Sequence, residues 1–397
     1  MPIKRTIAFV ANSGWSVYKF RLNLIKKLLA RGFSIYVLTP RDSYTAQFEG
    51  LDGLTYIELH HLKSRSISPF EDALLYQELL GHYRALNPEL IFHYTIKANI
   101  FGALAAARAR VPSISVITGL GYTFTGSGLL KAAVKLLYKQ ALRKSREVWL
   151  LNRDDRETLV SEKLVDPAKT FLLPGEGVDP DAFFASPREA GKKECTFLFI
   201  GRMIRHKGVY EFVQAAELLR QRGLAVKCQL LGFFDDNPAA IPRRQVEEWN
   251  GKKTVDYLGS TDQVAGFIEK ADCIVLPSYY GEGMPLSLLE GASMCKALIA
   301  ARTPGCRDLI EDGVNGYLCR QKDGRDLAEK MEAYYRLPET AKKQMGIEGR
   351  NKVLRYYTQD IIAGIYLDKI DSLRGDSLLT MADGDRQTTD RDWEIQD

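Results

Sequence analysis

The chain is poor in the residues that build metal sites. It has five histidines and six cysteines in 397 residues, and no two cysteines form a CxxC pair. His60 and His61 are adjacent, which is a poor spacing for a helical pair of ligands. These shortages argue against a zinc site, and they favour a reducing compartment with buried thiols. We expect no metal cofactor. Asp154-Asp155 and Asp235-Asp236 could hold Mg²⁺, although exposed surface acids are the simpler interpretation.

Long apolar runs and familiar nucleotide motifs are also missing. The sequence has no run of about 18 uninterrupted apolar residues, so we expect no membrane-spanning helix. Its N-terminus lacks the layout of a signal peptide, and we expect a cytoplasmic protein. Neither a G-x-G-x-x-G pattern nor a P-loop occurs, and the first glycine loop reads Asn12-Ser13-Gly14-Trp15. A Rossmann oxidoreductase and a nucleoside triphosphatase are therefore disfavoured.

Positive charge is concentrated in the first half of the chain. Residues 1–150 hold 20 Lys and Arg against nine Asp and Glu, a net charge of +11. Residues 151–397 hold 35 against 41, a net charge of −6. This asymmetry predicts that the first half meets an anion: a phosphate, a nucleic acid or a membrane surface. Because no aromatic–basic groove motif accompanies the charge, we do not expect a nucleic-acid partner.

The apolar pattern predicts two α/β domains. A length of 397 residues exceeds one ordinary core, and short apolar runs alternate with amphipathic stretches. The expected strands are Ile7–Val10, Ser34–Leu38, Leu90–Phe92, Ser113–Ile117, Val148–Leu151, Thr196–Ile200, Lys227–Leu231, Thr254–Leu258, Cys273–Leu276 and Ala297–Ala300. The expected helices include Phe20–Arg31, Asn99–Arg108, Val209–Gln221 and Pro285–Met294. Alternating strands and helices are typical of two doubly wound parallel sheets, which bind ligands at the carboxyl ends of their strands.

The polar stretch Pro174–Glu194 separates the two series of strands. We expect an N-terminal domain over residues 1–180 and a C-terminal domain over residues 181–360. A C-terminal helix over residues 361–375 would cross back to the first domain. Residues 376–397 hold seven acids and few large apolar side chains, which predicts a disordered tail.

Two loops of the second half carry the candidate chemistry. After one strand, Gly201-Arg202-Met203-Ile204-Arg205-His206-Lys207-Gly208 supplies a guanidinium fork and an ammonium group, which together suit a diphosphate. A basic loop can also be an ordinary solvated loop. In the second loop, GEGMPLSLLEG at residues 281–291, Gly283 lets the backbone come close to a ligand. Pro285 suits the first position of a helix whose N-terminus attracts phosphate. Its carboxylates, Glu282 and Glu290, cannot bind phosphate, so we expect them to accept hydrogen bonds from sugar hydroxyls.

Residues 127–146, SGLLKAAVKLLYKQALRKSR, form a basic amphipathic segment. Lys131, Lys135, Lys139 and Arg143 recur every four residues beside an apolar surface. Such a helix can lie on an anionic bilayer, or it can be a surface helix whose apolar side faces the core. The positive charge of the first half favours the membrane.

In this order, these loops resemble glycosyltransferase family 4, a retaining family with the GT-B fold. Glu282 to Glu290 is similar to that family's E-x7-E motif, and Gly201-Arg202 with Lys207-Gly208 is similar to its diphosphate-binding loop. The segment Pro174–Asp179 and the loops at Pro304–Cys306 and Asp312–Gly316 also match. The resemblance extends from Ile7 to about Leu373. It implies a GT-B architecture of two Rossmann-like domains that face each other across a cleft.

A narrower likeness concerns bacterial members that act on undecaprenyl-diphosphate-linked saccharides. It is carried by Tyr94–Gly102, Val116–Tyr122 and Gly232–Pro238. It implies that Lys97, Asn99 and Tyr122 contact the acceptor or the membrane, as the basic helix does. Many family members have a histidine in the loop that here reads Tyr94-Thr95-Ile96-Lys97, and it usually contacts the donor sugar. His93 stands a few positions early, and its role stays open.

The resemblance implies an enzyme that moves a hexose or N-acetylhexosamine from a UDP-sugar to a lipid-linked saccharide, with retention. Arg202 and Lys207 would stabilise the leaving diphosphate, and Glu282 would bind the sugar. The donor-binding residues would be Gly14, Gly201, Gly232, Gly283, Met284, Pro285, Leu286 and Glu290. The enzyme would work peripherally on the anionic inner face of the cytoplasmic membrane without a metal. The alternative is a UDP-sugar epimerase or hydrolase of the same fold.

Overall fold

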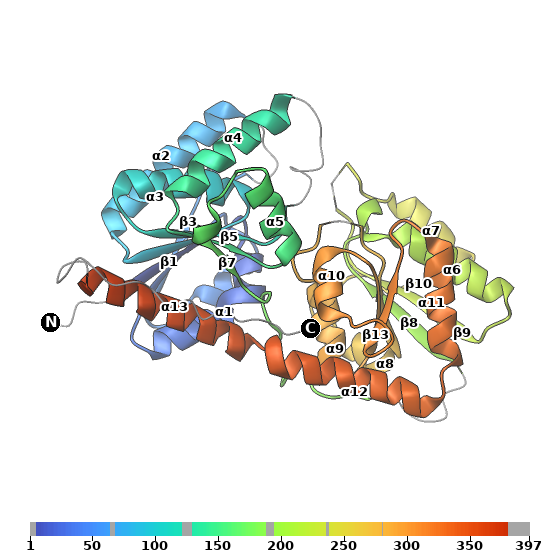
Figure 1. The fold of residues 1–397 in the computed structure, drawn as a ribbon. Helices are drawn as coiled ribbons and strands as arrows, with labels where there is room; N and C mark the ends of the chain where they lie inside the picture. The colour runs from blue at the N-terminus through green and yellow to red at the C-terminus, as the bar shows by residue number, and fades with distance from the viewer. Residues whose placement is uncertain are drawn as a thin grey trace.

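The computed structural model describes residues 5–63, 68–120, 129–187, 194–235, 238–279 and 281–379. They form two α/β domains side by side, with the C-terminal helices running along both (Figure 1). The described residues contain no helix long and apolar enough to cross a membrane.

The first domain is built on a seven-stranded parallel sheet in the order β3-β2-β1-β4-β5-β6-β7. Its strands are β1 (Thr6–Val10), β2 (Ser34–Thr39), β3 (Leu54–Glu58), β4 (Leu90–Tyr94), β5 (Ser113–Ile117), β6 (Glu147–Leu150) and β7 (Thr170–Leu172). Its helices are α1 (Gly14–Ala30), η1 (Thr45–Phe48), α2 (Pro69–Leu86), the π-helix η2 (Ala98–Gly102), α3 (Ala103–Ala109), α4 (Leu129–Lys144), α5 (Arg153–Ser161) and η4 (Pro167–Lys169).

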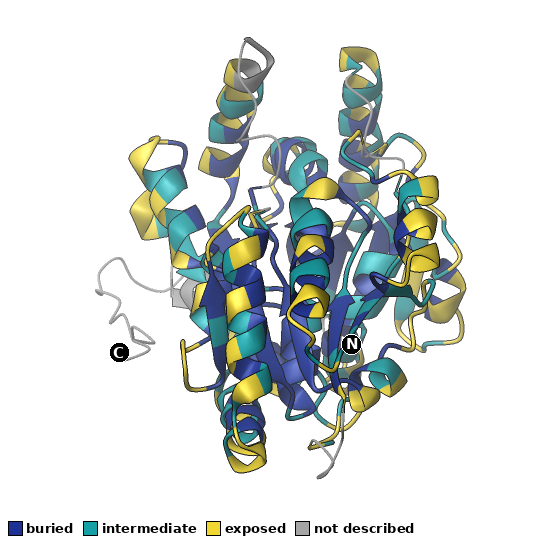
Figure 2. Cartoon of the chain, turned by 90° about the vertical axis from the view of Figure 1, so that its right-hand side faces the viewer, coloured by how far each residue is buried: buried dark blue, intermediate teal, exposed yellow. Residues whose placement is uncertain are grey.

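Alternating side chains of β1 explain why helices cover both faces of this sheet. Phe9 packs into a core that includes residues of α1 and of the C-terminal helix, whereas Ala8 and Val10 pack into a core with α2 and α3. A strand with helices on both faces reads as a continuous apolar run, which is why β1, β4 and β5 were predictable. Figure 2 shows buried strands between helices whose outer surfaces are exposed.

The second domain repeats this plan with a six-stranded parallel sheet in the order β10-β9-β8-β11-β12-β13. Its strands are β8 (Cys195–Ile200), β9 (Val226–Leu231), β10 (Asp256–Tyr257), β11 (Cys273–Leu276), β12 (Ala297–Ala301) and β13 (Gly316–Cys319). Its helices are η5 (Arg205–Lys207), α6 (Val209–Gln221), α7 (Arg243–Gly251), α8 (Ala265–Lys270), α9 (Leu286–Ser293), α10 (Pro304–Leu309), α11 (Gly324–Arg336) and α12 (Glu339–Tyr356).

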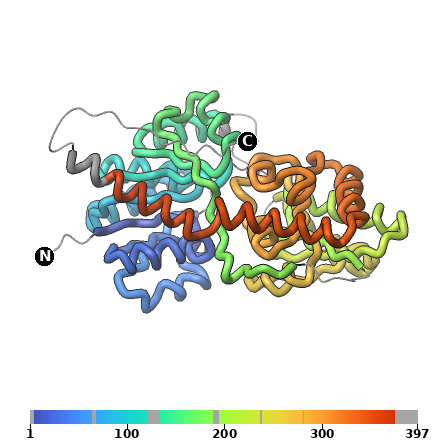
Figure 3. Tube along the Cα trace, turned by 60° about the horizontal axis from the view of Figure 1, so that its bottom comes forward, coloured from blue at the N-terminus to red at the C-terminus, as the bar shows by residue number. Residues whose placement is uncertain are grey.

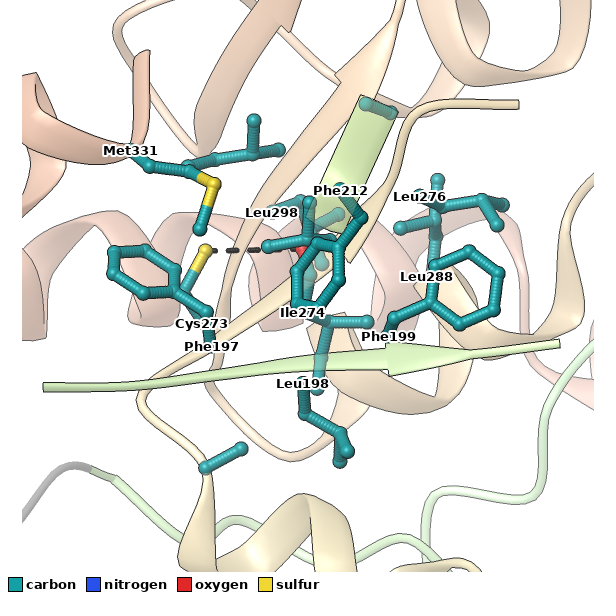
Figure 4. Packing of buried hydrophobic residues seen from close by; sticks show 14 of the residues in the cluster. Phe197, Leu198, Phe199, Phe212, Cys273, Ile274, Leu276, Leu288, Leu298 and Met331 are labelled. Atoms are coloured by element: carbon teal, nitrogen blue, oxygen red, sulfur yellow. Dashed lines mark hydrogen bonds between the residues drawn. The ribbon is translucent and has the colours of Figure 1, made fainter. Parts of the chain in front are cut away.

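One large apolar cluster holds this second domain together. Figure 4 shows side chains of β8, β11, α6 and α11 gathered in it. The rings of Phe199 and Phe212 lie 5.9 Å apart between centroids and are both fully buried. The cluster holds β8 and β11 side by side in the centre of the sheet, so the loops that follow these two strands begin next to each other.

Two chain segments cross between the domains next to each other. The linker residue Val178 accepts a hydrogen bond from the amide of Gln359 at 2.9 Å and donates one to the carbonyl of Tyr357 at 2.9 Å. Figure 3 shows this linker beside the α12–α13 segment. A Cβ on Gly177, which has φ +77°, would lie 2.9 Å from the backbone nitrogen of Gln359, so this close approach requires glycine.

The last helix, α13 (Gln359–Leu379), packs against α1 of the first domain. It begins two residues before the expected helix and continues four residues into the segment expected to be a tail. Residues 380–397, the rest of that expected tail, lie outside the described part of the chain.

A buried ion pair ties α1 to the linker at this crossing. The Arg21 guanidinium bonds to the Glu176 carboxylate and stacks on the ring of Tyr94, 3.8 Å from its centroid. Burial raises the pKa of Glu176, and the charge of Arg21 opposes that shift. Tyr94 in turn shares a hydroxyl–hydroxyl hydrogen bond of 3.1 Å with Tyr366 of α13. One buried cluster thus joins α1, the linker and α13.

Breaking this pair is expected to destabilise the first domain strongly. Glu176→Gln leaves the Arg21 charge buried without a counter-charge, which costs about 3 kcal/mol. The matched control is Asp371→Asn, which removes the pair between Arg5 and a carboxylate that is 55% exposed. That change should cost less than about 1 kcal/mol. Urea unfolding followed through tryptophan fluorescence would measure both, and equal midpoints for the two variants would contradict the expectation.

Candidate active site

Two loops of the second domain meet at the carboxyl edge of its sheet. One follows β8 and carries Arg202 and Lys207, and the other follows β11 and carries Glu282. β8 and β11 are neighbours at the point where the strand order reverses, so the loops that follow them face each other. The amide of Tyr279 donates to the carbonyl of His206 at 3.0 Å and joins the loops.

Lys207 and Glu282 are brought together at this edge. Lys207 Nζ lies 2.5 Å from Glu282 Oε1, and the Ser278 hydroxyl donates to the same oxygen at 2.7 Å. Both charged side chains are largely buried, with exposed fractions of 15% and 12%. An ammonium group has three N–H donors, so Lys207 can bind Glu282 and a second anion at once.

Arg202 forms an ion pair with the loop after β9. Its Nη1 lies 2.8 Å from Asp235 Oδ2, and the Asp235 side chain is 4% exposed. The expectation that Asp235 is an exposed surface acid is therefore wrong, and Asp236 lies outside the described residues. The guanidinium itself is about one third exposed and has five N–H donors, so this carboxylate orients Arg202 without using its whole binding capacity.

Glu290 lies buried in α9 and is paired across the domain boundary. Lys19 Nζ of α1 lies 3.1 Å from Glu290 Oε1, whose side chain is 4% exposed. Burial raises the pKa of Glu290, and Lys19 opposes the shift. No sequence motif marks Lys19, because the contact joins residues far apart in the chain. The carboxylate expected to bind ribose thus holds a first-domain ammonium group in this structure.

The start of α9 presents backbone donors. Pro285, the expected first helical residue, is instead the N-cap residue. Leu286 begins the helix, with its N–H in the unbonded first turn. The amides of Gly283 and Met284 donate no hydrogen bond within the part of the chain that the structure describes. These donors are arranged as an anion site requires.

The other expected donor-binding glycines have different structural reasons. A Cβ on Gly232, which has φ +156°, would collide with the carbonyl oxygen of Gly201, so the loops after β8 and β9 abut there. A Cβ on Gly201 would make only ordinary contacts. Gly14 lies against Asp42, whose carboxylate accepts from the amide of Trp15 at 3.0 Å. Asp42 therefore already caps α1 at this point.

The loop at residues 281–283 is pressed against the first domain. A Cβ on Gly283 would collide with the carbonyl oxygen of Thr118, at the end of β5. A Cβ on Gly119, which has φ +138°, would lie 2.9 Å from the carbonyl oxygen of Gly281. Arg307 of α10 pairs with Asp154 of α5 at 2.6 Å across the same boundary. The two domains are closed on each other at this loop.

Residues expected to contact the acceptor or the membrane fall into different environments. Lys97 pairs with Asp72 of α2 at 2.6 Å, and Tyr122 lies outside the described residues. The expectation that Asn99 contacts the acceptor or the membrane is wrong. Asn99 is fully buried, and its side-chain amide donates to the carbonyl of Val116 at 3.1 Å. It therefore supports the core and is not placed to touch a ligand.

His93 does not take the place of the family histidine in the cleft. Its side chain is fully buried, with Nε2 2.9 Å from the Tyr83 hydroxyl of α2. Burial lowers the pKa of His93 to about 3, so it stays neutral. The strained position nearby is Thr95, which has φ +71° at the end of β4, an uncommon conformation for a β-branched residue.

The basic helix α4 has an apolar exposed surface. Leu136 is 59% exposed and Leu137 41% exposed. Lys135 pairs with Glu162 at 2.5 Å, while Lys139 is half-buried and Arg143 is exposed. Tyr138, Ala141 and Leu142 face the core. The side chain of Lys131 lies outside the described residues. One side of α4 therefore packs against the core, as expected for a surface helix. Leu136 and Leu137 on the other side are exposed, which leaves the membrane alternative open.

Metal ligation has little support in the described residues, where no group of three or more His, Cys, Asp or Glu side chains could hold an ion. Asp154 is bound to Arg307. Asp155 is buried, so the surface-acid expectation is wrong for it. Burial raises the pKa of Asp155 to about 6, and its carboxylate accepts from the Asn152 amide at 3.0 Å.

Two known proteins are similar to this chain in sequence. The chain is 29% identical over 382 residues to N,N'-diacetylbacillosaminyl-diphospho-undecaprenol alpha-1,3-N-acetylgalactosaminyltransferase of Campylobacter jejuni, covering 92% of this chain and 98% of that relative. It is 27% identical over 276 residues to UDP-Gal:alpha-D-GlcNAc-diphosphoundecaprenol alpha-1,3-galactosyltransferase of Escherichia coli, covering 65% and 69%.

Structural and family comparisons agree with this likeness. Anabaena Alr3699/HepE, solved in complex with UDP and glucose, superimposes with a TM-score of 0.74 at 16% identity, over 93% of this chain and all of that one. Residues 182–352 match the family of glycosyl transferases group 1, and residues 6–152 match the glycosyl transferase 4-like family. With both domains matched in this order, the chain is a glycosyltransferase of the group 1, family 4-like kind, and it has the GT-B fold.

Proposed function

We propose that the enzyme transfers a hexose or N-acetylhexosamine from a UDP-sugar to a polyprenyl-diphosphate-linked saccharide, with retention, during assembly of a bacterial glycan. The observation that carries this proposal is the convergence of Arg202, Lys207 and Glu282 with the free amides before α9 at one sheet edge. Cations and amides suit a diphosphate, and a carboxylate beside them suits sugar hydroxyls. The names of both sequence relatives support the same acceptor class, and the name of the Escherichia coli relative supports a UDP-sugar donor.

The chemical step follows from these charges. The acceptor hydroxyl oxygen bonds to the anomeric carbon while the bond from that carbon to the diphosphate breaks. UDP leaves with the electron pair, and a donor phosphate oxygen takes the acceptor proton. Arg202 and Lys207 stabilise the charge that builds on the diphosphate, which is electrostatic preorganisation and needs no metal. Glu282 binds sugar hydroxyls and Glu290 binds ribose hydroxyls in place of Lys19.

An assay with purified protein tests the whole proposal. UDP- and GDP-sugars are supplied with and without a lipid-linked saccharide, and products are separated by lipid solubility. Labelled sugar should appear in the lipid phase only when the acceptor is present. Conversion of UDP-sugar without acceptor would instead indicate the epimerase or hydrolase alternative.

Loss of either cation should impair transfer severely. Arg202→Ala and Lys207→Ala should each lower kcat/KM by about 10²-fold, because each removes charge stabilisation from the leaving group. Lys227→Ala is the control, since Lys227 lies on β9 in a partly exposed pair with Asp256. Steady-state kinetics with a saturating acceptor measures the effect. Near-normal turnover in both site variants would remove the mechanism.

The contact between Gly283 and Thr118 predicts a sharp difference between two neighbouring glycines. Gly283→Ala would push the loop away from the first domain and misplace Glu282, which should lower kcat by about 10-fold or more. Gly281→Ala is the matched control, because a Cβ there meets nothing within 4 Å. Its kcat should stay within about two-fold of wild type. Equal kinetics for the two variants would show that the close approach has no role in turnover.

We also propose that α4 docks on the anionic inner face of the cytoplasmic membrane. Its exposed leucines and neighbouring cations provide apolar insertion and electrostatic attraction. Leu136→Gln with Leu137→Gln should weaken binding to phosphatidylglycerol-containing vesicles by about 10-fold, as burying two leucines is worth several kcal/mol at most. Leu354→Gln, at a 43% exposed leucine of α12, is the control. Sedimentation with vesicles gives the affinities, and unchanged binding would exclude α4 as the docking helix.

A further inference from the structure

Asn152 is a buried first-domain residue that reaches the backbone of the second-domain loop. It stands between β6 and α5 and is 3% exposed. Its amide nitrogen lies 3.3 Å from the carbonyl oxygen of Glu282 and 3.4 Å from that of Gly283. The same nitrogen lies 3.0 Å from the carboxylate of Asp155. No motif in the sequence marks this residue, and its two carbonyl partners lie 130 residues further along the chain.

These bonds have a consequence for the amides of the loop. In a trans peptide the carbonyl and the following N–H point in opposite directions, and the described chain has no cis peptide bond. Because the carbonyls of Glu282 and Gly283 face Asn152, the N–H groups of Gly283 and Met284 must point away from it. These are the two amides that donate to nothing within the described residues.

A glycine of each domain packs closely against these peptides. A Cβ on Gly305 would collide with the Gly283 carbonyl, so the carbonyl side has room only for glycine beneath it. Gly119 lies on the amide side. A Cβ added to it would lie 3.4 Å from the Gly283 nitrogen, which is van der Waals contact. The loop is thus held with its carbonyls bound to Asn152, and its two amides have no hydrogen-bond acceptor among the described residues.

We propose that Asn152 is a positioning residue that orients the Gly283 and Met284 amides as donors to the diphosphate of a nucleotide sugar. The inference rests on the proposed function and adds to it a residue from the opposite domain. Without the Asn152 amide, the two carbonyls lose their donor, and the peptides are free to rotate and turn their amides from the ligand. Preorganised backbone donors of this kind are lost when their peptides turn.

Asn152 also has a purely structural role, which the experiment must separate from its proposed role in orienting the loop amides. Its Oδ1 accepts from the amide of Asp155 at 2.8 Å and caps α5. Serine is also a favourable N-cap residue, so Asn152→Ser keeps a cap while removing the amide donor. Asn152→Asp keeps the shape and the cap and places a carboxylate against two carbonyls.

The experiment compares full-length wild type, Asn152→Ser and Asn152→Asp. Isothermal titration measures affinity for UDP and for uridine, which lacks the diphosphate. Both variants should bind UDP about 10-fold more weakly, bind uridine as wild type does, and lose about 10-fold or more in kcat with a melting temperature close to wild type. The Asp variant should lose more than the Ser variant.

The outcomes separate this inference from the proposed function. If wild type is active and Asn152→Ser has the same UDP affinity and kcat, Asn152 only caps α5. Equal losses of UDP and uridine affinity would likewise assign it a structural role. A wild-type protein that neither binds UDP nor transfers sugar would overturn the proposed function, and this inference with it.

Discussion

The close approach at Gly283 is the constraint on which the site depends. There is no room for a side chain between this residue and the Thr118 carbonyl, or between Gly305 and the Gly283 carbonyl. The loop is therefore held by steric contact from both domains together with the hydrogen bonds that its carbonyls accept from Asn152. Glu282, which stands next to Gly283, receives its position relative to Lys207 from that contact. A site built on a loop gains precision when its backbone is wedged in this way.

Charges that cross the domain boundary divide into two groups. Arg21 and Glu176 are buried at the crossing of the two chain segments, where breaking them leaves an uncompensated charge. Arg307 and Asp154 are about 40% exposed at the cleft, where the pair contributes little. The Tyr44 hydroxyl bonds to Asp262 across the cleft as well, and that bond raises the pKa of Tyr44 to about 12. The crossing thus acts as a fixed pivot, whereas the cleft contacts can exchange partners with a ligand.

The sequence predicted the central strands and the two loops that follow β8 and β11 because these have local signals. β5 and β11 appear at their expected bounds, and α6 runs over its expected residues. β3, β7 and β13 were missed. The first two are half-exposed edge strands, and β13 begins with a glycine. α1 begins at Gly14, six residues early, because the Ser13 hydroxyl caps it by accepting from Ser16 at 3.2 Å. Gly14 and Trp15, which were expected in a glycine loop, therefore belong to the helix.

Contacts made between distant segments could not be predicted from the sequence at all. Asp235 resembles any surface acid until β8 and β9 are paired, and only then does it reach Arg202. Asn99 was expected near the acceptor because of the family likeness, yet η2 places it in the core. Lys19 and Asn152 have no recognisable motif, since their partners are backbone or side chains of the other domain. Motifs locate the groups that touch a ligand, but they do not locate the groups that orient them.

Helix α1 connects the pivot to the site through two residues. Arg21 holds the linker at Glu176, and Lys19, two positions earlier on another side of the helix, reaches Glu290. Under the proposed function, a ribose hydroxyl that binds Glu290 would replace this interdomain ion pair with a contact inside the second domain. Lys19 would then lose its ion pair with Glu290, while Arg21 would keep its ion pair with Glu176 at the crossing of the two chain segments. Because a ligand shifts a conformational equilibrium only through contacts that differ between states, this exchange gives donor binding a direct means of changing domain closure.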